Sequence, residues 1–124
     1  MRLAGAVIVS TLQDLSLIDA RCGISVFRKI DVPILGIVEN MAHFVCTTCG
    51  TAHPILGEIA RPGVPFLGAI PQTMELRRAS DRGQPVTAMD PDGALRRAYC
   101  DLANRVAAAL ADTPSQATEG RAVP

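Results

Sequence analysis

The sequence predicts an α/β fold, a partial doubly wound parallel sheet of about three strands with flanking helices. Three short apolar runs, at residues 5–9, 33–38 and 65–70, show no polar alternation, which is typical of strands buried on both faces. Amphipathic stretches follow the first and third runs, and prolines and glycines separate the segments. Ligands of such sheets bind beyond the carboxyl ends of the strands, so residues there are the first candidates for a site.

The first run and the stretch after it predict one parallel, right-handed β–α–β unit. Thr11 and Asp14 have capping-box spacing, so we expect residues 10–11 to open a helix over residues 13–29. This helix has a broad apolar face, which places Cys22 in the core as a small apolar residue. The face is formed by Leu15, Leu17, Ile18, Cys22, Ile24 and Phe27.

The rest of the chain predicts further helices on either side of the third strand. Residues 51–54 resemble a turn, and residues 55–61 could form only about two helical turns. A short charged helix is expected over residues 73–82. Asp90 is a good N-cap for a last helix over residues 91–111, on which Cys100 is a structural residue. We therefore expect one domain over residues 1–111 and a disordered tail over residues 112–124.

Composition excludes several classes of function. The 12 basic and 12 acidic residues cancel, and the chain has three Phe, one Tyr and no Trp, so no nucleic-acid surface is expected. The apolar start is too short to span a membrane. Four cysteines without a signal peptide are too few for a disulfide scaffold, which favours a reducing, cytoplasmic location.

The most informative stretch runs from the second strand into a pair of thiols. The strand over residues 33–38 is followed by Glu39 and Asn40, and then by Cys46 and Cys49 in a C-x-x-C spacing. Two cysteines at this spacing can bind one metal ion or cluster, or form a redox disulfide. A ligand site at the carboxyl end of this strand is therefore expected.

The spacing alone leaves three interpretations of the thiol pair open. The two cysteines could be inert. They could bind zinc within one chain, together with His43 and His53 in an H-x2-C-x2-C-x3-H pattern. They could also supply half of a four-thiolate site that a second copy completes across a two-fold axis.

No catalytic constellation is found in the sequence. The only lysine, Lys29, has no glycine close before it, so the phosphate-binding pattern G-x-x-x-x-G-K-[ST] is absent. The patterns G-x-G-x-x-G and H-E-x-x-H are absent too, and no nucleophile, base and orienting residue form a set. We assign no catalytic residue.

The run V-E-N-M followed by F-V-C-x-x-C, within residues 36–50, resembles the Mrp-type iron–sulfur cluster carrier proteins. These are P-loop ATPases of the MinD/ParA superfamily. The segments GVPFLGAIPQTMELRRASDRGQPV and DPDGALRRAY continue the match, which covers roughly residues 3–110. The expected fold is then a fragment of a P-loop NTPase.

This resemblance implies a specific cofactor, site and set of partners. It implies a homodimer, or a heterodimer with a paralogue, that binds a 4Fe-4S cluster through two C-x-x-C pairs, to which Cys46 and Cys49 correspond. Asn40 matches the residue that contacts the adenine of ATP, and Pro71 a position that lines the base pocket. Apo iron–sulfur proteins would receive the cluster. The alternative is a non-enzymatic zinc-binding or interaction module derived from a truncated ATPase.

The departures from the family also carry expectations. Only the C-terminal half is matched, because the family's Walker A loop, Mg²⁺-binding residues and Walker B strand have no counterpart in the sequence. ATP hydrolysis by this chain alone is not expected, since no group holds the β- and γ-phosphates. The first strand would lie mid-sheet in the complete fold. Its unpaired edge predicts marginal stability and self-association.

Overall fold

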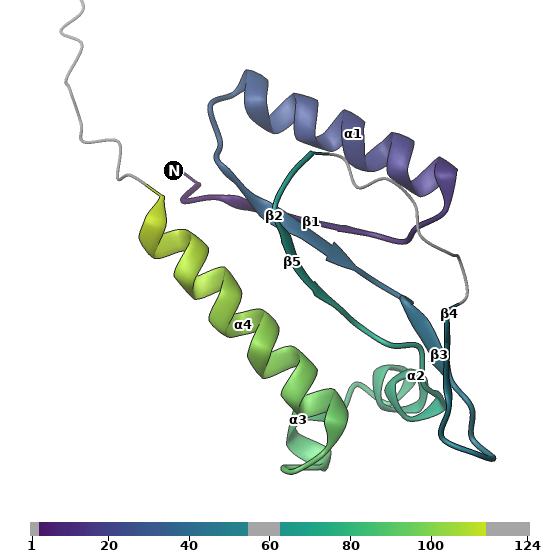
Figure 1. Ribbon diagram of the computed structural model, residues 1–124. Coiled ribbons are helices and arrows are strands. Elements are labelled where there is room, and N and C mark those ends of the chain that lie inside the picture. The colour runs from purple at the N-terminus through teal and green to yellow at the C-terminus, as the bar shows by residue number, and fades with distance from the viewer. Residues whose placement is uncertain (1–2, 55–62, 114–124) are drawn as a thin grey trace, which may run out of the picture.

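The computed structural model describes residues 3–54 and 63–113, and its centre is a parallel sheet of three strands. The strands are β1 (Ala6–Ser10), β2 (Ile34–Glu39) and β5 (Phe66–Ala69), in the order β1-β2-β5. Helix α1 (Asp14–Lys29) covers one face and α4 (Ala94–Asp112) the other (Figure 1). The predicted α/β class and parallel pairing are confirmed, and each strand begins and ends within one residue of the predicted bounds.

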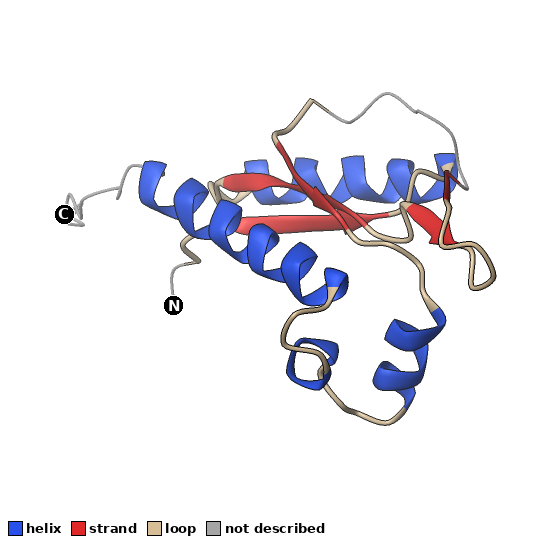
Figure 2. Cartoon of the chain, turned by 60° about the horizontal axis from the view of Figure 1, so that its bottom comes forward, coloured by secondary structure: helices blue, strands red, loops and turns tan. Residues whose placement is uncertain are grey.

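Helices lie on both faces of the sheet (Figure 2), and an apolar cluster fills the space on each side. On the α1 side, Ile8 and Ile37 pack against Ala20 and Ile24. On the α4 side, a cluster of Val38, Leu67 and Ile70 is covered by Tyr99, Leu102 and Val106. β2 is the only strand of this described sheet with a neighbour on both edges, and its four central residues are buried. The continuous apolar runs of the sequence therefore reflect burial on both faces.

Helix α1 differs from the prediction in its start and in its buried face. β1 extends to Ser10, so the helix begins only at Asp14, and the Thr11 hydroxyl bonds Ser16 Oγ at 2.9 Å instead of capping the helix. Only Leu17, Ala20 and Ile24 are fully buried against the sheet. The expectation that Cys22 belongs to the core is wrong, because a helix on a sheet buries one stripe and Cys22 lies outside it, exposed.

Three helices lie within residues 63–113, the described C-terminal part: α2 (Met74–Asp81), α3 (Val86–Met89) and α4. Thr73 caps α2 by accepting a hydrogen bond from Leu76 N–H at 3.1 Å. The predicted capping of α4 by Asp90 is wrong. Asp90 Oδ1 accepts a bond from Asp92 N–H at 3.2 Å within a turn, and the helix begins three residues after Pro91. Cys100 is exposed on α4, which extends to Asp112, the first residue assigned to the predicted tail.

A second, two-stranded antiparallel sheet was not predicted. It consists of β3 (His43–Val45) and β4 (Ala52–Pro54), so the predicted turn at residues 51–54 is wrong. The two helical turns predicted at residues 55–61, and the tail after residue 113, lie outside the described residues. Among the helices that are described, none is both long and apolar enough to cross a membrane.

Gly36 permits the close approach of β5 to β2. Its φ is +154°, and a Cβ at this position would lie 2.5 Å from the Pro65 carbonyl oxygen and 2.7 Å from Leu67 Cγ. We expect Gly36→Ala to lower the free energy of unfolding by about 1–3 kcal/mol, because an added methyl group overpacks the sheet. Urea denaturation followed by circular dichroism measures the change.

Gly23→Ala is the matched control for this substitution. Gly23 lies inside α1, and no atom lies within 4 Å of a Cβ added there. Alanine should therefore raise the free energy of unfolding by about 0.5–1 kcal/mol through its higher helix propensity. Equal stability of the two variants would contradict the assigned role of Gly36.

Candidate functional site

The thiol pair lies on a hairpin that projects beyond the carboxyl ends of β2 and β5 (Figure 1). After β2, Met41 adopts a left-handed conformation with φ of 53°, which turns the chain out of the sheet. Ala42 N–H donates to Ile70 O at 3.1 Å, and Gln72 N–H donates to His43 O at 2.8 Å. These bonds fasten the base of the hairpin to the segment after β5, so the sheet positions the site.

The tip of the hairpin is a tight turn that contains both cysteines. Cys46 N–H donates to Thr51 O at 3.0 Å, and Gly50 N–H donates to Cys46 O at 2.9 Å. Gly50 has a φ of 71°, a conformation that glycine adopts at little cost. These backbone hydrogen bonds therefore hold Cys46 and Cys49 on the same turn.

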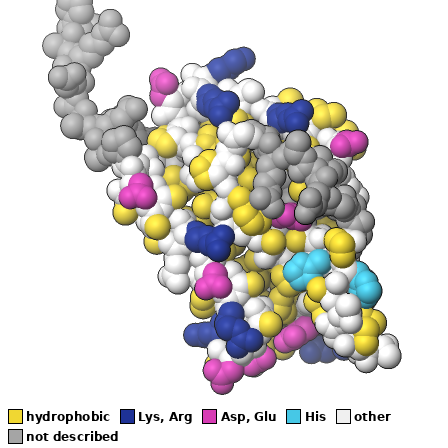
Figure 3. All heavy atoms as spheres, viewed as in Figure 1, with side chains coloured by type: hydrophobic (Ala, Val, Ile, Leu, Met, Phe, Trp, Pro, Cys, Tyr) yellow, Lys and Arg dark blue, Asp and Glu magenta, His cyan; other side chains and the backbone are white. Residues whose placement is uncertain are grey.

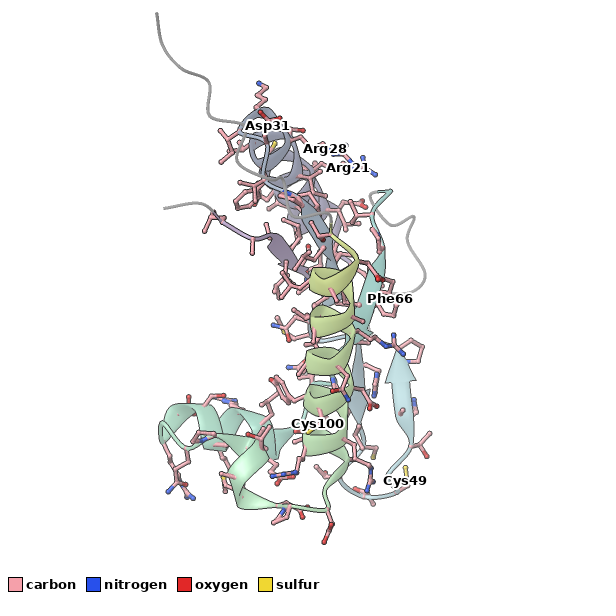
Figure 4. All side chains as sticks on the ribbon, turned by 90° about the vertical axis from the view of Figure 1, so that its left-hand side faces the viewer. Arg21, Arg28, Asp31, Cys49, Phe66 and Cys100 are labelled. Carbon is pink, nitrogen blue, oxygen red and sulfur yellow. The ribbon has the colours of Figure 1, made fainter. Side chains whose placement is uncertain are left out.

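The two thiols differ in environment and are both free. Cys46 is half-buried, whereas Cys49 is exposed at the outer end of the hairpin (Figure 4). The Cys49 thiol also donates to Thr51 Oγ1 at 3.2 Å. The pKa of Cys46 is lowered, first by the backbone amide of Cys49, then by that of Thr48, with a smaller contribution from the Cys49 thiol. Amides directed at this sulfur stabilise a thiolate, which is the form that binds metal.

The hairpin does not bring the two histidines together. In the β3–β4 register His43 is opposite Pro54, and His53 is opposite Phe44. Residues directly opposite share a face and neighbours along a strand alternate, so His43 and His53 belong to opposite faces. Figure 3 shows them as two separate cyan groups. Across residues 3–54 and 63–113, no three His, Cys, Asp or Glu side chains gather as a metal ion would require.

The two predicted base-contacting residues lie at the same edge of the sheet, and only Asn40 lines the cavity beside β1. Asn40 follows β2, where its backbone N–H donates to Ser10 O at 2.8 Å and its Oδ1 accepts a bond from Met41 N–H at 3.0 Å. It lines an open cavity of about 470 Å³ formed with β1 and α1. Pro71 follows β5, on the opposite side of β2, and does not line this cavity.

Sequence reasoning proposed the cysteines as a site but missed the parts of the fold that position them. Neither the β3–β4 pairing nor the anchoring of the hairpin by Gln72 was expected. Three-residue strands are too short to show a period, and backbone bonds of Gln72 leave no trace in its side chain. The one available signal was Gly50 directly after Cys49, because a glycine after two turn residues often closes a hairpin.

Comparison with known proteins agrees with the resemblance inferred from the motifs. Residues 1–107 match the family model described as "ParA: NUBPL iron-transfer P-loop NTPase". The chain is 43% identical over 107 residues to the iron-sulfur cluster carrier protein of Pseudomonas fragi. It is 46% identical over 116 residues to the iron-sulfur protein required for NADH dehydrogenase, mitochondrial, of Arabidopsis thaliana. These matches cover 82% and 89% of this chain, but only 37% of either relative.

A solved structure supports the fold independently. The cell division ATPase MinD of Pyrococcus furiosus superposes with a TM-score of 0.63 at 21% identity, over 85% of this chain and 43% of that structure. The chain thus has the fold of part of a MinD-type ATPase and spans little more than a third of the length of the two relatives. On the family model and these identities, the chain belongs to the NUBPL iron-transfer family of ParA-type P-loop NTPases.

Proposed function

We propose that this chain carries an iron–sulfur cluster as cargo on Cys46 and Cys49 and passes it to apo iron–sulfur proteins. The observation that supports this best is the hairpin tip, where two free thiols share one turn at the outer end of the molecule. The names of the relatives, an iron-sulfur cluster carrier and an iron-sulfur protein, point to the same chemistry.

The donor set of one chain fits half of a cluster site. A cubane cluster of the 4Fe-4S type takes four thiolates, whereas the described hairpin offers two thiols, and no third His, Cys, Asp or Glu of the described residues gathers with them. A second copy, or a paralogue with the same motif, would supply the other two across a two-fold axis. The hairpin projects beyond the sheet (Figure 1), so a second copy would meet it at its tip.

The surroundings of the thiols favour both binding and release of cargo. The amides of Cys49 and Thr48 stabilise the Cys46 thiolate, and the same donors would take up charge from a bound cluster. Cys49 is exposed, so an incoming thiolate of a recipient protein could reach the metal beside it and replace it as a ligand. Free thiols in these roles require a reducing compartment such as the cytoplasm.

The nucleotide part of the proposal is limited to the adenine side. Asn40 and the polar cavity beside β1 would contact a base, whereas Pro71 lies across β2 from that cavity. No phosphate-binding loop is present in the sequence, so we propose no ATP hydrolysis by this chain alone. In the complete relatives the remaining part of the protein would contribute the phosphate contacts.

Substitution of either hairpin cysteine tests the cargo site. After anaerobic reconstitution with iron and sulfide, we expect the unsubstituted chain to show a brown chromophore and about four iron atoms per dimer. Cys46→Ser or Cys49→Ser should abolish the chromophore and the cluster-dependent dimer, because a two-fold axis removes two ligands for each substitution. Absorption spectra, iron analysis and size-exclusion chromatography give the result.

The matched controls are the two exposed cysteines outside the hairpin. Cys22→Ser and Cys100→Ser should keep the chromophore, since these residues lie on α1 and α4. His43→Ala and His53→Ala should keep it as well. One zinc ion per monomer, lost on substitution of either histidine, would instead support the zinc-binding module and refute the cluster site.

The chain alone should bind ATP weakly or undetectably. Contacts to the base contribute little when the phosphates, which dominate affinity in P-loop proteins, have no cradle of backbone amides. Isothermal titration calorimetry with Mg-ATP should give no dissociation constant in the micromolar range. Micromolar binding that Asn40→Ala abolishes would show that the cavity beside β1 suffices by itself.

A further inference from the structure

We propose that the outward face of α1 is a self-association surface, on which α1 of a second copy packs antiparallel with Cys22 near the two-fold axis. This contact is separate from the hairpin and requires no cluster. Three features of α1 support it: an exposed apolar stripe, the distribution of charge along the helix and the position of Cys22.

An apolar stripe runs along the side of α1 that faces away from the sheet. Leu15, Ile18 and Val26 are 73%, 54% and 57% exposed, and Cys22 between them is exposed too. Their spacing of three and four residues places them on one face of a helix, opposite the buried Leu17, Ala20 and Ile24. α1 therefore has two apolar faces, of which the sheet covers one.

A stripe of this length differs from ordinary exposed apolar residues. Single exposed leucines or valines are common on protein surfaces, but a contiguous apolar patch marks a contact site. Cys22 is a small residue halfway along the stripe, so two such helices could approach closely at that point. Ile18 and Val26 each lie four residues from Cys22, so an antiparallel copy centred there would set Ile18 of one chain against Val26 of the other, twice by symmetry.

The charges on α1 select the antiparallel arrangement. Asp14 lies in its first turn, and Arg28 and Lys29 lie in its last. Neither Asp14 nor Arg28 takes part in an ion pair within residues 3–54 and 63–113. An antiparallel pair centred on Cys22 brings Asp14 of each copy beside Arg28 of the second copy, twice by symmetry. A parallel pair would bring like charges together at both ends.

Side-chain directions agree with this arrangement. Arg21 and Arg28 project to the same side of α1 (Figure 4), and helical spacing places Asp14 on that flank. The Arg21 side chains of the two copies would therefore also meet near the axis, which weakens the contact. Ile18 of one copy then faces Val26 of the second, and the methylene groups of Lys29 cover Leu15. One helix from each copy buries little area, below the roughly 1,200 Å² of stable complexes, so the contact is weak and calls for a cross-linking test.

Oxidative cross-linking through Cys22 tests the proposal directly. A full-length chain with Cys46, Cys49 and Cys100 replaced by serine retains only Cys22. In the control chain the only remaining cysteine is Cys100, which is also exposed but lies on α4. Diamide takes two electrons and two protons from two thiols and becomes a hydrazine, while one S–S bond forms. We expect the Cys22 chain to form disulfide dimers at least tenfold faster. Equal rates would overturn the proposal.

Charge reversal identifies the partner as a second copy in antiparallel orientation. In the chain that retains Cys22, Asp14→Arg or Arg28→Asp alone should slow cross-linking at least threefold, and the double substitution should restore the rate. Asp101→Arg, an exposed reversal on α4, should change nothing. Circular dichroism checks that each variant is folded.

The possible outcomes separate this contact from other ways of associating. Failure of the double reversal to restore cross-linking would overturn the antiparallel pair. Cross-linking that Ile18→Glu leaves unchanged would overturn it too, and would indicate association through the open edge of β1. Because these chains lack Cys46 and Cys49 and contain no iron, the result is independent of the proposed cargo site.

Discussion

The structure depends on β2 having a strand on each edge and a helix on each face. This strand supplies residues to both layers of the core, Ile37 toward α1 and Val38 toward α4. Its backbone pairs with β1 and β5, and Gly36 lets β5 approach where a side chain would collide with Pro65. The position of the carboxyl end of β2 is therefore fixed, and with it the position of the hairpin that carries the thiols.

The sequence predicted those parts of the fold that are governed by burial. Unbroken apolar runs identify strands covered on both faces, because no position in them can be polar without cost. The prediction failed where two different local structures are compatible with the same sequence pattern. α1 has two apolar faces, and only the sheet decides that Leu17 is buried while Cys22 is exposed. Before α4, Asp90 is compatible with a helix cap or with a turn, and in the structure its side chain accepts a hydrogen bond from Asp92 N–H within a turn.

The sequence predicts a chemistry for the candidate site but not its geometry. The spacing of Cys46 and Cys49 predicts a thiolate ligand pair, whereas the separation of His43 from His53 depends on a strand register that the sequence does not reveal. The backbone amides directed at Cys46 are likewise invisible in a sequence, since every residue except proline has one. These donors favour the thiolate form of Cys46, which two cysteines that are merely close in sequence would not share.

The two proposed contacts between copies use different parts of the chain, the hairpin tip beyond the sheet and the outer face of α1 (Figure 1). Each contact is isologous, so each is generated by a two-fold axis, and two contacts on different surfaces generally have different axes. One copy can then be joined to a second through a cluster and to a third through α1. Cluster binding would be the stronger link, because four metal–thiolate bonds hold it. The α1 contact would raise the local concentration of hairpins, which favours the meeting of two half-sites before any cluster is bound.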